Sequence, residues 1–114
     1  MIHNGDKPIF LQLAEVIKNR ILDNTLSFDD RIPSVRDLAA EFEVNNNTSM
    51  HAIEKLALEN IVYQKRGLGY FVTKDAKQII EQQRRQQFTE SFLPILKKAM
   101  TDLNISKEEL MDML

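Results

Sequence analysis

Two short helical patterns separated by a polar break constrain the fold of this chain more than any other feature. Between residues 34 and 42, apolar side chains recur at the three- and four-residue steps of an amphipathic helix, for only about two turns. Three consecutive asparagines, residues 45–47, then precede a second helical pattern that reaches Ala57. Two short helices joined by a tight turn are the geometry of a helix-turn-helix.

The flanking segments extend this pattern. Pro8 suits the first turn of a helix, and apolar residues repeat at helical spacing from Phe10 to Ile21. Two β-prone stretches, residues 61–63 and 70–73, surround the glycine-bearing turn QKRGLG, as the strands of a β-hairpin do. The order helix, helix, turn, helix, hairpin predicts a winged helix-turn-helix, a mainly α fold with one small β-hairpin.

Polar residues at the expected helix ends support these boundaries. Ser34 is expected to cap the second helix, and Asn45 or Asn46 is expected to cap the third, because their side-chain oxygens accept hydrogen bonds from free backbone N–H groups. The segment 26–34 is interpreted as a connection between the first two helices, and Pro33 is expected to bias Ile32 toward extended geometry. We therefore expect a winged domain over residues 1–75.

Residues 76–114 are expected to form a helical tail with one apolar stripe. The side chains of the stripe that we assign to dimerisation are Ile80, Phe88, Phe92, Leu96 and Met100. Pro94 should kink or break this helix near Phe92, because proline lacks an N–H and its ring clashes with the preceding turn. Ser106 begins a capping box for a short last helix. The stripe needs burial, either against the winged domain or against a second copy of the chain.

Composition and residue spacing argue against several functions. The chain has no cysteine, so disulfides and thiol catalysis are excluded. Its apolar runs are too short to cross a membrane, and its first residues do not resemble a secretory signal, which fits a cytoplasmic protein. His3 and His51 have no metal-ligand spacing, and no loop is suited to cradle a phosphate. We therefore expect no enzyme activity, no metal and no cofactor.

The charge of the chain restricts how it could bind nucleic acid. The formal net charge is −2, and residues 1–75 carry nine Lys or Arg against eleven Asp or Glu. Binding to DNA would therefore depend on cations that are clustered on one face of the domain.

The start of the third helix supplies candidate base contacts. Capping accounts for one asparagine, and the next residues, Asn47 and Thr48, would lie in the exposed first turn that meets DNA in a recognition helix. Asparagine can bond adenine at two points, and threonine can contact a phosphate or a thymine methyl. His51 would face the same groove. The alternative is a polar helix start in solvent.

Cations near the expected turns are candidate phosphate contacts. Arg36 lies at the start of the second helix, where the helix dipole disfavours a positive charge, so we expect it to bind either a phosphate or a nearby carboxylate, Asp29 or Asp30. Lys65 and Arg66, at the hairpin turn, are either phosphate contacts or solubilising surface cations. The candidate DNA-binding set is Ser34, Arg36, Asn45, Asn46, Asn47, Thr48, His51, Lys55, Lys65, Arg66, Gly67 and Gly69.

Residues spread over positions 8–73 resemble the GntR family of bacterial transcription regulators. The matching residues are Pro33, Ser34, Arg36, Leu38, Ala39, Val44, Thr48, Gly67, Gly69, Phe71 and Val72. The resemblance implies DNA contacts by Arg36 and Thr48. The chain departs from the family pattern at Asn46 and Leu68, where arginine is usual. It also departs at Ser49, an inward position that is usually apolar, and we expect this hydroxyl to bond back to a helical carbonyl.

The short tail resembles the YtrA-like branch of that family. The resemblance implies a homodimer whose reading helices lie about 34 Å apart, on a palindromic operator in double-stranded DNA. Repression by blocking polymerase is the expected outcome, although activation is equally open. The rival hypothesis is a winged module that binds a protein and not DNA. The sequence identifies neither the operator nor a small-molecule effector.

Overall fold

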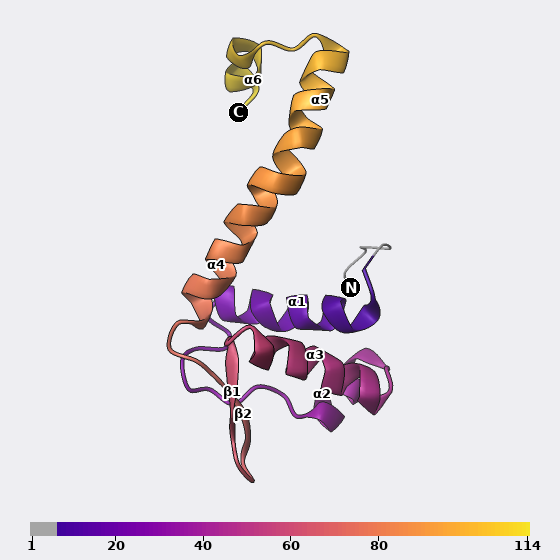
Figure 1. Ribbon diagram of the computed structural model, residues 1–114, viewed down its shortest axis with the longest axis vertical. Helices are drawn as coiled ribbons and strands as arrows, with labels where there is room; N and C mark the ends of the chain where they lie inside the picture. Colours follow the sequence, from indigo (N-terminus) through magenta and orange to yellow (C-terminus); the bar gives the residue numbers. More distant parts are fainter. Residues whose placement is uncertain (1–6) are drawn as a thin grey trace. The chain divides into compact units, whose positions relative to one another are not determined.

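Figure 1 shows the architecture of the computed structural model, which describes residues 7–114. Along the chain the elements are α1 (Ile9–Leu22), α2 (Val35–Phe42), α3 (Asn46–Leu58), β1 (Val62–Lys65), β2 (Gly69–Val72), α4 (Ala76–Gln87), the π-helix η1 (Phe88–Phe92), α5 (Leu93–Leu103) and α6 (Lys107–Met113). Strands β1 and β2 pair antiparallel. This order confirms the predicted winged helix-turn-helix. The chain divides into two compact units between Ile80 and Glu81, which we call the winged unit and the tail unit.

One apolar core holds the winged unit together. Helices α1 and α2 and strand β1 all contact α3, so α3 is the element on which the others pack. The buried core residues are Leu13, Ala14, Ile17, Ile21, Ile32, Leu38, Ala52, Ile53, Leu56, Ile61, Val62, Val72, Ala76 and Ile80. Full burial of each larger aliphatic side chain contributes about 1.5–3 kcal/mol, so this core outweighs any single surface contact.

Polar side chains set the ends of α2 and α3. The Ser34 hydroxyl caps α2 by accepting the backbone N–H of Asp37 at 3.1 Å, as predicted. Glu43 ends α2 in a left-handed conformation with φ of 54°. The first asparagine of the run, Asn45, then caps α3 by accepting the N–H of Thr48 at 2.8 Å. The two caps fix the start of each helix in the helix-turn-helix.

The segment 26–34 connects α1 to α2, as predicted, and part of it pairs with the hairpin. Arg31 forms an isolated antiparallel bridge with Phe71 of β2. The next residue, Ile32, donates its N–H to the carbonyl of Tyr70 at 2.9 Å. Pairing satisfies backbone groups that the outer edge of β2 would otherwise expose. Pairing with β2 thus adds to the bias toward extended geometry that Pro33 imposes on Ile32.

The first turn of α4 belongs to the winged unit. Ala76 and Ile80 are 1% and 0% exposed, respectively, and both join the core. Because Ile80 is buried within its own chain, its predicted role in dimerisation was wrong. The division between the compact units accordingly lies after Ile80, whereas we expected the domain boundary after residue 75.

Pro94 disturbs the helix where we predicted, but the helix does not end there. The residues just before the proline form the π-helix η1, and the N–H of Leu93 reaches back to the carbonyl of Phe88. A π turn is a known way to accommodate a local interruption of the α-helical ladder. The helical backbone therefore continues from α4 through η1 into α5.

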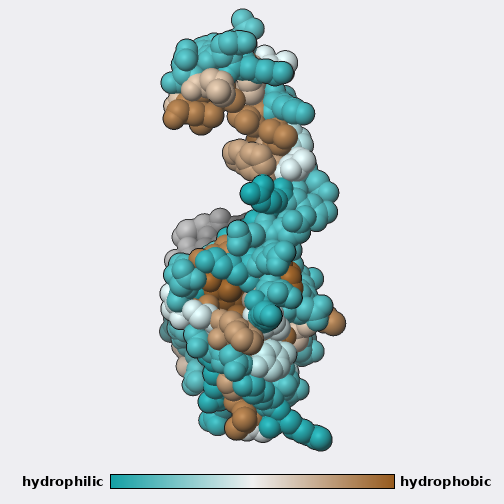
Figure 2. Space-filling model, turned by 90° about the vertical axis from the view of Figure 1, so that its left-hand side faces the viewer, coloured by the Kyte–Doolittle hydropathy of each residue, from teal (hydrophilic) through white to brown (hydrophobic). Residues whose placement is uncertain are grey.

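The tail unit has no buried side chain among residues 81–114. Its last helix, α6, is capped as predicted, because the Ser106 hydroxyl accepts the N–H of Glu109 at 3.0 Å. Figure 2 shows apolar side chains gathered between α5 and α6. Within residues 7–114, no helix is long and apolar enough to cross a membrane.

Candidate nucleic-acid interface

The first turn of α3 exposes two asparagines. Asn45 is held by its cap and also accepts a hydrogen bond from the Thr48 hydroxyl at 3.1 Å. Asn46 and Asn47 are exposed, and neither side chain has a hydrogen-bond partner within the part of the chain that the structure describes. The Thr48 hydroxyl thus donates a hydrogen bond within the protein, whereas the side-chain amides of Asn46 and Asn47 have no partner among residues 7–114.

Side chains in the next turns of α3 make contacts within the protein. The exposed ring of His51 makes an edge contact with Phe10 of α1, with ring centroids 5.7 Å apart. Lys55 pairs with Glu59 on the same helix at 3.4 Å, and Glu59 also binds Lys18 of α1 at 3.0 Å. The predicted cation Lys55 is therefore largely committed to the α1–α3 contact.

Arg36 is exposed at the start of α2. Its guanidinium makes no hydrogen bond or ion pair with any residue from 7 to 114. The alternative partners that we considered, Asp29 and Asp30, bind other groups: Asp29 binds Lys65, and Asp30 accepts the N–H of Ser27 at 2.8 Å. The ion-pair interpretation of Arg36 was wrong.

A buried hydroxyl joins α2 to α3. Ser49 is 0% exposed, and its Oγ donates to the carbonyl of Val35 at 2.8 Å. The acceptor is a helical carbonyl, as expected, and it belongs to α2 instead of the helix that carries Ser49. This bond holds the start of α2, including Arg36, against the first turn of α3.

Lys65 is held within the wing, defined here as β1, β2 and their turn. Its ammonium lies 3.0 Å from the Asp29 carboxylate and 4.2 Å from the centroid of the Phe71 ring. The Tyr63 hydroxyl donates to the same carboxylate. We call these four residues, Asp29, Tyr63, Lys65 and Phe71, the wing clasp. The clasp neutralises the charge that we had assigned to a phosphate contact.

The clasp shifts the pKa values of its members. The Tyr63 hydroxyl, and next the Lys65 ammonium, lower the pKa of Asp29 below 3.8. The carboxylate in turn raises the pKa of Tyr63 above 10.0 and that of Lys65 above 10.5. All three shifts favour the state in which Asp29 is ionised, Tyr63 is neutral and Lys65 is charged.

The two wing glycines have different surroundings. Gly67 adopts φ of +78° at the exposed turn, and a Cβ there would meet nothing within 4 Å. Gly69 adopts φ of +115°, and a Cβ there would lie 3.0 Å from the Nε of Arg31. Between these glycines and the clasp, Arg66 is exposed and has no partner in residues 7–114.

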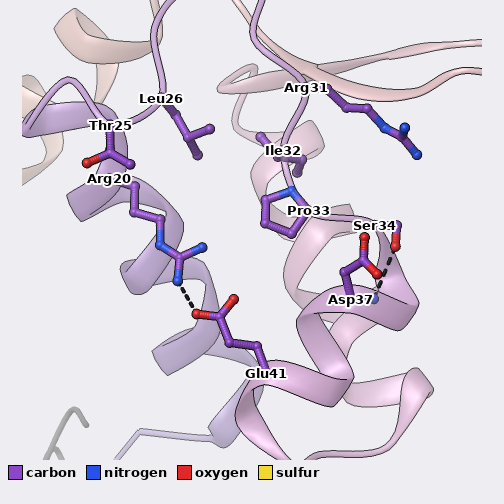
Figure 3. Close-up of a pocket in the computed structure, with 9 residues that line it drawn as sticks. All are labelled: Arg20, Thr25, Leu26, Arg31, Ile32, Pro33, Ser34, Asp37 and Glu41. Atoms are coloured by element: carbon purple, nitrogen blue, oxygen red, sulfur yellow. Dashed lines mark hydrogen bonds and ion pairs between the residues drawn. The ribbon is translucent and has the colours of Figure 1, made fainter.

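A hollow lies between the ends of α1 and α2 and the segment before α2, and Figure 3 shows its lining. Within it, Arg20 of α1 is paired with Glu41 of α2. Arg31 extends away from that pair and, in the described chain, binds no acidic side chain. We did not foresee Arg31 as an interface residue, because its position depends on the pairing with β2.

Half of the Lys and Arg side chains among residues 7–80 form ion pairs within the chain. Those in ion pairs are Lys7, Lys18, Arg20, Lys55 and Lys65. Among residues 7–80, the cations with neither an ion pair nor a hydrogen bond are Arg31, Arg36, Arg66 and Lys74. The net negative charge of the chain therefore coexists with a set of available arginines, as a local DNA-binding surface requires.

The predicted dimerisation residues of the tail remain accessible, except for Ile80. The rings of Phe88 and Phe92 stack with centroids 5.6 Å apart and are 52% and 55% exposed, respectively. Leu96 and Met100 line the groove between α5 and α6. Across residues 7–114, no group of three His, Asp or Glu side chains could hold a metal ion.

These features define the class of the protein as a winged helix-turn-helix. Comparisons with known proteins then give the family. Residues 10–72 match the family described as bacterial regulatory proteins, gntR family. The chain belongs to this family of DNA-binding transcriptional regulators.

Individual relatives extend the likeness beyond the winged unit. The HTH-type transcriptional regulator YhcF of Bacillus subtilis is 33% identical over 108 residues, which are 95% of this chain and 88% of the relative. The HTH-type transcriptional repressor YtrA of the same organism is 34% identical over 61% of this chain and 54% of its own length. A crystal structure of a GntR-family regulator from Bacteroides thetaiotaomicron is 37% identical, with a TM-score of 0.78, over 93% of this chain and 92% of that one.

Proposed function

We propose that this protein is a homodimeric repressor that occupies a palindromic operator and blocks polymerase. The observation that carries the proposal is that Asn46 and Asn47, in the first turn of α3, and Arg36, in the first turn of α2, are exposed and have no side-chain partner among residues 7–114. Exposed amides and arginines at the start of a recognition helix fit base edges and phosphates. Family membership does not favour the rival hypothesis of a protein-binding module.

The contacts of the winged unit assign different roles to its candidate residues. Asn46 and Asn47 are proposed to read base edges, since their amides are free to bond adenine. Arg36 and Arg66 are proposed to bind phosphates. Because the Thr48 hydroxyl donates to Asn45, we assign Thr48 to contact through its methyl group.

Three other members of the predicted set support these contacts indirectly. Ser34 and Asn45 hold the helix starts in place, and Gly67 permits the left-handed backbone of the wing turn. His51 is proposed to lie in the groove against Phe10. The ion pairs of Lys55 and Lys65 remove both from the phosphate contacts.

The tail unit supports the proposal of a homodimer. Its large apolar side chains are exposed within one chain, and a contiguous apolar surface of this kind usually marks an interaction site. A two-fold pair would place two copies of α3 about one turn of DNA apart, roughly 34 Å, which matches a palindrome. YtrA, which is named a repressor, is consistent with repression here.

Binding of the protein to the duplex upstream of its own gene, followed by fluorescence anisotropy across a salt series, tests this proposal. Wild type should prefer that duplex to a random one and should bind less tightly as salt rises. Arg36→Ala should flatten the plot of log K against log salt by about one unit per bound protomer. Asn47→Ala should cost about 1–3 kcal/mol of discrimination at one base pair.

Lys98→Ala is the matched control, because Lys98 is already paired with Asp102 in the tail unit. It should change neither the slope nor the sequence preference. A wild-type protein that selects no preferred site from fragments of the whole genome would contradict the operator proposal.

A further inference from the structure

We infer that Arg31 is a phosphate-binding residue of the DNA interface, and that Asp29 keeps Lys65 out of that interface. The inference rests on the proposed DNA binding and adds a residue from the segment before α2. It also reverses the assignment that the wing sequence suggests, in which the adjacent cations Lys65 and Arg66 both bind phosphate.

Arg31 and the clasp share one face of the hairpin. Tyr63 is paired with Phe71 across the strands, and Lys65 is paired with Gly69, so all four positions point to the same side. The opposite side carries Val62 and Val72, which are buried in the core. The face with Tyr63 and Lys65 is therefore the solvent side of the wing.

The segment before α2 adds two charged residues to this solvent side. The Asp29 carboxylate binds both Lys65 and Tyr63. Arg31 bridges Phe71 through its backbone, and its side chain lies against Gly69. One carboxylate therefore cancels one ammonium, and the remaining positive charge on this face belongs to Arg31.

The guanidinium of Arg31 is positioned by its surroundings. The strand pairing of residues 31 and 32 with β2 fixes its backbone, and the absence of a side chain at Gly69 lets Nε approach the wing. Asp37 lines the same hollow but forms no ion pair with Arg31. A restrained, unpaired guanidinium loses little freedom on binding, and its planar fork suits a phosphate.

Arg31 also lies along the path that joins the other proposed contacts. It is two residues before Pro33 and three before the α2 cap, Ser34, so it connects the wing to the start of α2 where Arg36 lies. Three arginines, Arg31, Arg36 and Arg66, then represent the backbone-binding charge of each protomer.

The salt dependence of binding to a random-sequence duplex tests the inference without knowledge of the operator. Arg31→Gln should flatten the plot of log K against log salt by about one unit per bound protomer. Lys65→Gln removes the same charge from the neighbouring strand and should leave the slope unchanged. Asp29→Asn should steepen the slope by about one unit, because it releases Lys65 while an amide still accepts from Tyr63.

Arg31→Lys is the conservative variant, and it should keep the wild-type slope while its circular dichroism confirms the fold. An unchanged slope for Arg31→Gln, or a slope flattened equally by Lys65→Gln, would overturn the inference. Salt-sensitive binding with these shifts but no preference for any operator would support the inference and contradict the proposed repressor. Wild-type binding without salt dependence would overturn both.

Discussion

The winged unit and the tail unit differ in how they bury their apolar side chains. The winged unit encloses fourteen core residues contributed by helices, strands and the first turn of α4. The tail unit, residues 81–114, has no buried side chain, and large residues such as Phe92 and Leu103 stay more than half exposed. A core can close when elements distant in sequence pack together, whereas successive helices of a short tail leave one face open.

The ion pairs differ in the same way. In the winged unit some of them join residues far apart in sequence, as Lys65 with Asp29 and Arg20 with Glu41. In the tail, Lys98 pairs with Asp102 one helical turn away. Contacts between distant segments therefore hold the winged unit together, and we propose that the tail unit completes its core with a partner.

The largest expected effect comes from the core of the winged unit. Leu56→Ala should lower the free energy of unfolding by about 2–5 kcal/mol, because Leu56 is fully buried on α3 and truncation leaves a cavity. Urea denaturation followed by circular dichroism measures this loss. Leu103→Ala in the tail, where the side chain is 69% exposed, is the control and should change stability by much less. Equal losses of stability in the two variants would contradict the conclusion that only the winged unit has a buried core.

A charge on the tail should affect association instead of folding. Phe92→Asp should weaken the proposed dimer by about 2 kcal/mol or more, roughly thirtyfold in Kd, if Phe92 is a buried aromatic of the dimer interface. Sedimentation equilibrium measures the change. Leu58→Asp, on a side chain that is 81% exposed in the winged unit, is the matched control and should leave association intact. Wild-type association in Phe92→Asp would rule out this face as the interface.

A smaller effect should come from the hydroxyl that joins α2 to α3. Ser49→Ala removes the donor to the Val35 carbonyl and should cost about 1 kcal/mol of stability. Thermal unfolding detects the shift. Ser91→Ala, at an exposed position of η1, should have almost no effect. If both substitutions were equally neutral, the buried bond would not contribute to the helix-turn-helix.

The contribution of the wing clasp to the stability of the fold should depend on pH. The lowered pKa of Asp29 means that the clasp stabilises the fold above pH 3.8 and that this contribution is lost as acid protonates the carboxylate. The raised pKa values of Tyr63 and Lys65 mean that the contribution persists below pH 10 and is lost as base removes those protons. Between these limits it should not vary with pH.

Ultraviolet titration checks this prediction in a Tyr70→Phe background, where Tyr63 is the sole tyrosine. Tyr63 should ionise at a higher pH in that background than when Asp29→Asn is added. Identical titration curves would show that the carboxylate does not hold the phenol.

The sequence alone determined the order of the winged elements, because local signals specify them. The apolar spacing of α1 to α3, the caps Ser34 and Ser106, and the glycine turn are properties of neighbouring residues. The exposed asparagine run followed from the same local logic, since a cap fixes which residues enter the first turn.

Only the tertiary structure decided which candidates are available. The availability of Arg31 and Arg36, the neutralisation of Lys65 by Asp29, and the burial of Ile80 depend on contacts between distant segments. Residue spacing does not show which carboxylate reaches which cation, or which end of an apolar stripe joins a core that other segments form. Such pairings depend on three-dimensional packing, and here that packing selects the arginines that remain free.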